Sequence, residues 1–328
     1  MENFNLIEYH HTRDFSRKMN ATFEFIRQNF KSLGKSILVI AGPPVIVASL
    51  IIATFLGEFF DLMKAAATNS GNAEVFETYF MSVNFWLQTL LMLVLFLLSS
   101  IMSIATINNY IILYEEKRTN NIDVVEVWRR VRETFWMYFG TTLVFFLLAI
   151  AAYIVLLIPV GILAVISPLL VFLGMMAMVC AVVYLVVSVS LTYIVRAYEK
   201  KGFFDAVMRS FGLVRDKWWS TFGLIFVLYI VMMTISYIFL IPWYVTMAAT
   251  ALHSTSTEML DQSTMAWSTI VLFTLYYLAQ MVLGALPNIG IAFQYFNLVE
   301  LKEAKGLMTQ IETLGQAHPP APSAEEQF

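Results

Sequence analysis

The stretch VRETFWMYFG, residues 131–140, returns 83 positions later as VRDKWWSTFG, residues 214–223. Five of the ten positions are identical, and two more keep their chemical character. The same offset places Pro159 on Pro242, and each proline follows an isoleucine at the end of a long apolar run. A register that holds from residue 131 to residue 159 predicts an internal repeat.

A third and weaker copy is IRQNFKSLG, residues 26–34, in which Arg27 and Phe30 stand where the first stretch has Arg132 and Phe135. Each copy carries apolar residues spaced by 4, 3 and 4, which places them on one face of a helix. These quartets are Met19, Phe23, Ile26 and Phe30; Val124, Trp128, Val131 and Phe135; and Val207, Phe211, Val214 and Trp218. The pattern predicts three amphipathic helices that lie along a membrane interface and then bend into it.

The composition is that of a membrane protein. Hydrophobic residues make up 59% of the chain and charged residues 13%, with a mean hydropathy of +0.73, whereas charged residues are about a quarter of a soluble domain. Six segments lack Asp, Glu, Lys, Arg and His, and each is about twenty residues or longer, enough to cross ~30 Å of hydrocarbon. They are 37–57, 84–112, 138–158, 169–195, 222–241 and 266–298.

One further apolar stretch, IPVGILAVISP at residues 158–168, is too short to cross and is bracketed by prolines. We expect it to form an outer-surface hairpin or a partly embedded loop. The orientation follows from the basic residues, because nineteen of the 20 Lys and Arg residues fall on one side of the six crossings and only Lys64 on the other. The positive-inside rule makes the basic side cytoplasmic, so both termini are expected there.

The predicted fold class is all-α: a polytopic membrane protein with six transmembrane helices in three tandem repeats, each led by an amphipathic cytoplasmic helix. Residues 1–305 form the membrane domain, with repeats at about 13–117, 118–201 and 202–303. The returning helices end alike, in YIILYEEK, YIVRAYEKK and YFNLVELKE, and they are expected to line the middle of the bundle. The tail, 306–328, has no apolar periodicity and is expected to be cytoplasmic and largely disordered.

No pattern in the chain predicts catalysis, a metal site or a cofactor. The four histidines, His10, His11, His253 and His318, form no metal-ligand spacing and are expected to be solvated. The carboxylates Glu115, Glu116 and Glu199 lie close to lysines, which favours ion pairs at the inner surface. We therefore predict that the protein is not an enzyme, and that it has no nucleic-acid partner. The absence of charge within the spans also disfavours ion-coupled transport.

The repeat singles out Arg27, Arg132 and Arg215, which are equivalent by register. Each stands where an amphipathic helix is expected to meet the bilayer, so anionic lipid headgroups are candidate ligands. A purely topological role explains them as well. The amide side chains in the crossings concentrate on the returning helices, where they serve either close helix packing or a polar cavity. They are Asn84, Gln88, Asn108, Asn109, Gln280, Asn288 and Gln294.

The threefold pattern, clearest in AVMRSFGLVRDKWWSTFGL at residues 206–224, resembles the membrane domain found beside glycerophosphodiester phosphodiesterases in bacteria. It is similar as well to related six-helix bacterial membrane proteins, over about residues 15–300. In the enzyme members a separate barrel domain performs hydrolysis, and no segment here matches that barrel. The resemblance implies a stand-alone domain of the bacterial inner (cytoplasmic) membrane without inherited catalytic residues.

Two functions are compatible with these observations. The leading interpretation is a non-catalytic integral inner-membrane protein that binds membrane lipids or a membrane protein partner. The alternative is a passive or facilitated transporter, with a cavity between the returning helices. A sealed and tightly packed middle favours the first interpretation, and a polar cavity open to one face favours the second.

Overall fold

The computed structural model describes residues 6–68, 72–253, 262–304 and 308, and the regular structure in these ranges is helical throughout. The predicted tail at 306–328 lies outside the described residues apart from Met308. The helices are α1 (Phe15–Thr68), α2 (Asn72–Phe80), α3 (Val83–Lys117), α4 (Val124–Ile166), α5 (Pro168–Val189), α6 (Thr192–Glu199), α7 (Phe203–Val214), the 3₁₀ turn η1 (Arg215–Lys217), α8 (Trp218–His253), α9 (Gln262–Leu283) and α10 (Ala285–Glu303).

Six helical stretches of the described chain are long and apolar enough to cross a membrane. They are Phe15–Met63, Val83–Lys117, Val124–Ile166, Pro168–Glu199, Phe203–Ala249 and Trp267–Glu303. To within one residue, each contains one of the charge-free segments. The prediction of an all-α protein with six helices able to span a membrane is therefore confirmed.

The predicted stretch at residues 158–168 does contain the turn of a hairpin, at Ser167, but the expectation of a loop there is wrong. Helix α4 continues through Pro159 to Ile166, and α5 begins at Pro168 with only Ser167 between them. Proline fits the first turn of α5, where its missing N–H has no helical partner to lose. Ser167 caps that turn, since its hydroxyl accepts a hydrogen bond from the Leu169 N–H at 3.3 Å. Proline inside a long apolar helix is tolerated when its surroundings compensate for the lost hydrogen bond.

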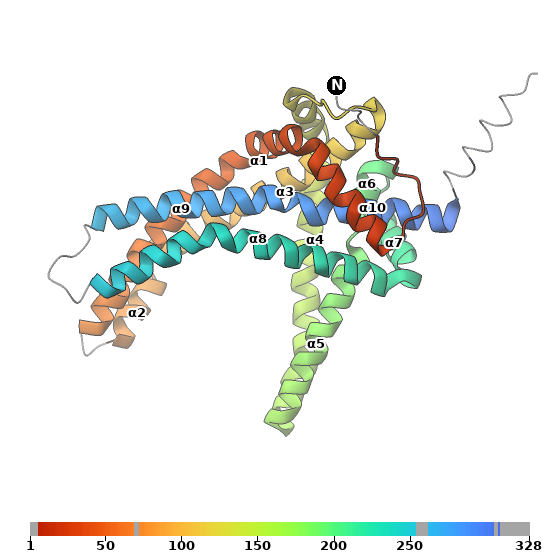
Figure 1. Ribbon diagram of the computed structural model, residues 1–328. Coiled ribbons are helices and arrows are strands. Elements are labelled where there is room, and N and C mark those ends of the chain that lie inside the picture. The colour runs from red at the N-terminus through yellow and green to blue at the C-terminus, as the bar shows by residue number, and fades with distance from the viewer. Residues whose placement is uncertain (1–5, 69–71, 254–261, 305–307, 309–328) are drawn as a thin grey trace, which may run out of the picture.

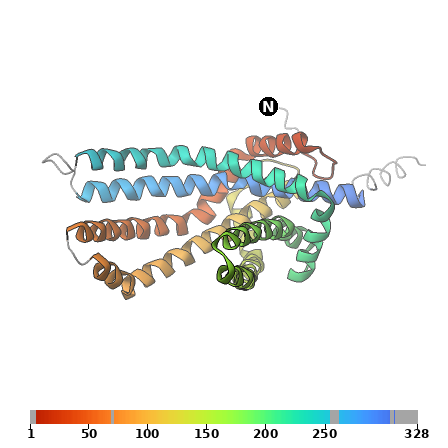
Figure 2. The ribbon, with the colours of Figure 1, turned by 90° about the horizontal axis from the view of Figure 1, so that it is seen from below.

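The helices leave a common junction in two directions (Figures 1 and 2). The second half of α1, the first half of α3, α8 and α9 lie side by side as a four-helix bundle, in which α1 contacts both α3 and α9. The α4–α5 hairpin projects away from this bundle, and α4 contacts α3 as well as α5. At the junction lie α6, α7, α10 and the beginnings of α1 and α4.

The main hydrophobic core lies at this junction, where the ends of several crossings meet the leading segments. Its largest fully buried side chains include Phe25, Tyr110, Tyr138, Tyr295 and Phe296. Most apolar side chains of the α4–α5 hairpin are instead exposed or half-buried. In a membrane, lipid tails cover such side chains, and each helix satisfies its own backbone hydrogen bonds. The junction therefore holds the fold together, and the two arms are apolar surfaces suited to lipid.

Candidate functional site

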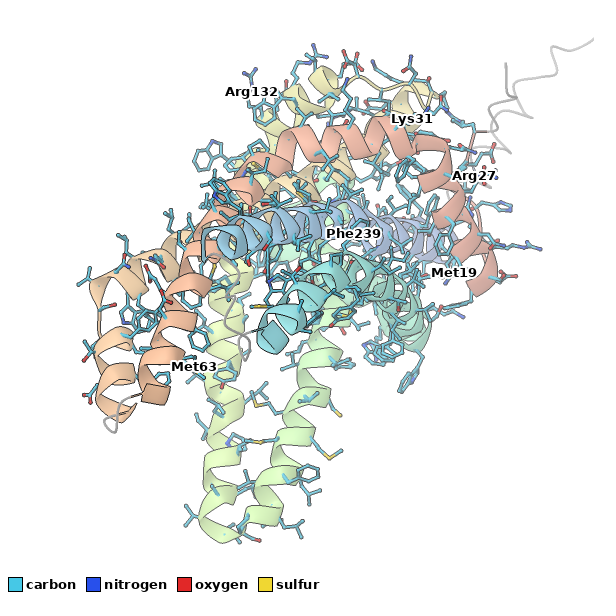
Figure 3. All side chains as sticks on the ribbon, turned by 60° about the vertical axis from the view of Figure 1, so that its left-hand side comes forward. Met19, Arg27, Lys31, Met63, Arg132 and Phe239 are labelled. Atoms are coloured by element: carbon cyan, nitrogen blue, oxygen red, sulfur yellow. The ribbon has the colours of Figure 1, made fainter. Side chains whose placement is uncertain are left out.

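The three candidate arginines lie at three separate places around the junction. Arg27 is on α1, Arg132 on α4 and Arg215 in η1, and all three side chains are exposed. Figure 3 shows Arg27 and Arg132 well apart on the outside of this end of the molecule. Arg27 pairs with Glu24 at 2.8 Å, whereas Arg132 forms no ion pair with any residue that the structure describes. The fold thus offers three peripheral sites and not one shared pocket.

Two of these arginines share a helix face with an exposed tryptophan. Trp136 follows Arg132 by four residues, and its side chain is 73% exposed. Trp219 follows Arg215 by four residues and is 77% exposed. Residues four apart lie on the same face of a helix, and tryptophan and basic residues are both favoured at a membrane–water boundary. In the first copy this position is Lys31, which is also exposed.

The apolar side of the leading segments is also partly exposed. On α1, Phe23 is 42% and Phe30 is 61% exposed, and on α7, Phe204 is 72% and Met208 is 75% exposed. An amphipathic helix that faced only the protein core would bury this side. The exposed apolar residues support contact between the leading segments and the boundary region of a bilayer.

The face of α1 that is buried carries polar side chains, which the sequence did not reveal. Lys18 is 2% exposed, and its Nζ donates hydrogen bonds to Gln294 Oε1 at 2.7 Å and Ser220 Oγ at 3.0 Å. Gln294 Nε2 in turn donates to Thr221 Oγ1 at 2.8 Å. These contacts join α1, α8 and α10. The sequence alone does not predict this burial of Lys18, because its partners lie more than two hundred positions away.

Other amides of the returning helices are also used in packing. Asn109 Nδ2 donates to Thr134 Oγ1 at 2.8 Å, linking α3 to α4. Asn288 Nδ2 donates to the Gly284 carbonyl of its own helical segment at 2.8 Å. A narrow gap of about 140 Å³ lies beside Tyr9, but it is too narrow to admit a water molecule. It is lined by Tyr9, Phe25, Ile111, Ile289, Ala292, Phe293 and Phe296.

The segment before α1, residues 6–14, enters the middle of the junction. Tyr9 is 4% exposed, and its hydroxyl donates to the Ile111 carbonyl of α3 at 3.1 Å. Its ring stacks on Phe296 of α10, with 4.8 Å between centroids. Burial raises the pKa of Tyr9 well above its ordinary value, so the hydroxyl keeps the proton that it donates. The returning helices do converge, and this segment occupies the space between them.

Two further residues of this segment, His10 and Arg13, also contact the helices. His10 Nε2 lies 3.1 Å from Tyr198 Oη of α6 and 3.5 Å from Glu115 Oε1 of α3. The Arg13 backbone N–H donates to Asn297 Oδ1 of α10 at 2.6 Å. His10 was expected to be solvated, but it is half-buried, because α3 and α6 converge on it. His11 is exposed as expected, while His318 and the side chain of His253 lie outside the described residues.

The expected ion pairs at the helix ends are confirmed for two of the three carboxylates. Glu116 accepts two hydrogen bonds from the Arg130 guanidinium, at 2.5 and 2.7 Å. Glu199 contacts Lys201 at 2.7 Å and Arg209 at 3.1 Å. Glu115 instead faces His10 and Tyr198. These carboxylates connect the returning helices to their neighbours.

The fold and these contacts define an all-helical protein with six helices that can span a membrane. Among the residues that the structure describes, no group of three or more His, Cys, Asp or Glu side chains could hold a metal ion. No family model, curated protein or solved structure matches the chain. The resemblance to the phosphodiesterase-associated membrane domain therefore stays a prediction.

Proposed function

We propose that this protein is a non-catalytic integral membrane protein that binds anionic lipid headgroups at Arg27, Arg132 and Arg215. These arginines lie at its basic end, the end of the molecule that carries the exposed basic residues around the junction. One observation carries the proposal. An exposed arginine is followed four residues later by an exposed tryptophan, at Arg132 and Trp136 and again at Arg215 and Trp219. A basic residue near an anionic membrane surface contributes about 1 kcal/mol of attraction. The adjacent tryptophan fixes the depth of the helix at the boundary.

The same proposal includes three tandem units and a cytoplasmic location for the basic end, in a bacterial inner membrane. One observation supports equivalent returning helices: each of the three ends at a residue with left-handed backbone. These are Arg118 (φ 54°), Lys200 (φ 55°) and Ala304 (φ 48°), a common way to end a helix. The units are not identical, because α1 and α4 run on without a break, whereas η1 separates α7 from α8.

A passive or facilitated transporter has less support. That function needs a wettable path between the returning helices, and the gap beside Tyr9 is apolar and too narrow for water. Several amides that could line such a path are engaged in hydrogen bonds between or within helices. The packing of the described residues therefore favours binding over transport.

The test is a triple substitution, Arg27→Gln, Arg132→Gln and Arg215→Gln, with copurifying lipid measured by native mass spectrometry. We expect the occupancy of anionic lipid to fall about fivefold per site, since each lost charge removes about 1 kcal/mol. The loss should be larger in low salt, where surface attraction is least screened.

The matched control is Arg17→Gln, Arg129→Gln and Lys217→Gln, three exposed basic residues of the same α1, α4 and η1. It removes the same charge without touching the proposed sites, so its lipid content should fall less than that of the first triple variant. If the first triple variant inserts correctly and keeps its anionic lipid, the three arginines serve topology alone.

A further inference from the structure

The N-terminal segment, residues 6–14, lies outside the helices and is held in shape by its own hydrogen bonds. The Arg13 guanidinium donates to the carbonyls of Tyr9 at 3.1 Å and His11 at 3.4 Å, and to that of Glu8. The His11 N–H donates to the Tyr9 carbonyl at 2.9 Å. A peptide that is already held in its bound shape loses less conformational freedom when it binds. The segment therefore resembles a preorganised ligand.

The hydroxyl groups that receive this segment also have partners on the helices. Tyr114 Oη accepts a hydrogen bond from the Ile7 N–H at 3.1 Å and itself donates to Gln28 Oε1 of α1 at 3.2 Å. Tyr198 Oη of α6, which contacts the segment as described above, donates to Glu115 Oε1 at 3.2 Å. Both hydroxyls thus keep a hydrogen bond without the segment, so its departure does not strand them.

The segment meets the C-terminal ends of three helices that are far apart in the sequence. Its hydrogen bonds reach the last two turns of α3, α6 and α10, at Ile111, Tyr114, Tyr198 and Asn297. The C-terminal end of a helix carries a partial negative charge, which favours a nearby cation. The segment supplies one, because the Arg13 guanidinium lies 5.4 Å from the centre of the Phe293 ring.

A single side chain anchors the segment. Tyr9 is the one buried residue among positions 6–14, whereas Glu8, His11 and Thr12 are exposed. Its ring lies 5.6 Å from Phe293 and 4.8 Å from Phe296, measured between centroids. One buried aromatic anchor with exposed neighbours is typical of a bound peptide, in which few residues carry most of the binding energy.

We propose that the ends of α3, α6 and α10 form a peptide-binding site, and that residues 6–14 are its ligand, which can leave and rebind while the helices stay folded. The ligand class is a short peptide in which a tyrosine is followed four residues later by an arginine. Because the segment is tethered, its effective concentration is about millimolar, which excludes a free peptide of the same sequence. The three arginines take no part, so either proposal can fail without the other. The site consists of Ile111, Tyr114, Tyr198, Phe293, Phe296 and Asn297.

The experiment adds a fluorescent peptide with the sequence of residues 6–14 to full-length protein in mild detergent and measures fluorescence anisotropy. The Tyr9→Ala variant has lost the anchor of its own segment, so its site is open to the peptide. We expect this variant to bind the peptide at least about tenfold more tightly than the native protein, whose tethered segment competes. A peptide that itself carries Tyr9→Ala should bind neither protein.

The matched control is full-length His11→Ala. His11 is exposed on the same segment, so this variant keeps its anchor and should exclude the peptide as the native protein does. Equal binding of the peptide to the native protein and both variants would overturn the proposal. A folded Tyr9→Ala variant that does not bind the peptide would overturn it too.

Hydrogen exchange in the native protein gives a second test that does not depend on the folding of a variant. The N–H groups of Ile7 and Arg13 are bonded to Tyr114 Oη and Asn297 Oδ1. If the segment leaves by itself, these two amides should exchange at least about tenfold faster than the buried amides of α10 around Phe296. Exchange at the same slow rate as α10 would show that the segment opens only when the helices unfold, and the proposal would be wrong.

Discussion

Tyr9 combines a buried aromatic ring with one buried hydrogen bond, so two substitutions can separate these contributions. Tyr9→Phe removes only the bond to the Ile111 carbonyl and should lower the free energy of unfolding by about 0.5–1.5 kcal/mol. Tyr9→Ala also empties the space between Tyr114 and Phe296 and should cost about 3–5 kcal/mol. Denaturant titration in a mild detergent measures both changes.

The control for this prediction is Tyr153→Ala. Tyr153 is 55% exposed on α4, so its removal should change the stability in detergent by less than about 0.5 kcal/mol. Equal effects of Tyr9→Ala and Tyr153→Ala would mean that the segment before α1 does not contribute to the stability of the junction.

At the level of residues, the sequence predicted local spacing well and distant contacts poorly. The four-residue spacing of Arg132 and Trp136, and of Arg215 and Trp219, is visible in the repeated stretch. The burial of Lys18 was not predictable, because its partners Ser220 and Gln294 become neighbours only after α8 and α10 have packed on α1.

At the level of elements, two glycines test how closely the helices pack. A Cβ added to Gly290 of α10 would overlap Leu228 of α8, which is fully buried, whereas one added to Gly161 of α4 would meet nothing within 4 Å. Gly290→Ala should therefore destabilise the protein by about 1–3 kcal/mol. Gly161→Ala should be neutral or stabilising by about 0.5–1 kcal/mol. Thermal unfolding in detergent compares them.

The double variant Gly290→Ala with Leu228→Val checks the cause of this effect. Shortening the leucine makes room for the added methyl group, so the double variant should be more stable than the sum of the two single changes predicts. Simple additivity would show that the contact between α8 and α10 is not what the alanine disturbs.

The positions of the spanning helices followed from the absence of charge, but the turn after α4 did not. An unbroken apolar run predicts a spanning helix because few other backbone arrangements survive in hydrocarbon. Pro159 and Pro168 were interpreted as the borders of a loop, yet one lies inside α4 and the other starts α5. Proline breaks a helix less reliably when the helix is long and apolar. Pro168 therefore marked a helix boundary correctly, whereas Pro159 did not.

For the whole molecule, the orientation of the two arms can be tested by labelling single cysteines with a membrane-impermeant maleimide. In a Cys180→Ala background, Glu77→Cys on α2 should react from outside the cell, and Asn121→Cys between α3 and α4 only after permeabilisation. Both positions are exposed. The positive-inside rule predicts this pattern, because the basic residues lie on the side of Asn121. The reverse pattern would contradict a cytoplasmic location of the basic end.

The tip of the α4–α5 hairpin needs its own probe, because the hairpin and the bundle leave the junction in different directions. Val165 is 89% exposed at this tip. If the hairpin crosses the bilayer, Val165→Cys should react from outside, as Glu77→Cys does. Protection of Val165→Cys from both sides would place the tip within the membrane and reduce the number of complete crossings.

The contacts of residues 6–14 determine when the junction can assemble during biosynthesis. The ribosome makes Tyr9 and Arg13 before any of the helices that hold them, and the Asn297 partner of Arg13 is separated from it by 284 positions. At about 5–20 residues per second, that interval lasts roughly 15–60 s. During this time the nascent segment has no complete binding site, so the junction closes only after Asn297 has been made. A bulky tag fused ahead of residue 6 would therefore impede the last step of assembly, whereas the insertion of the earlier helices would proceed normally.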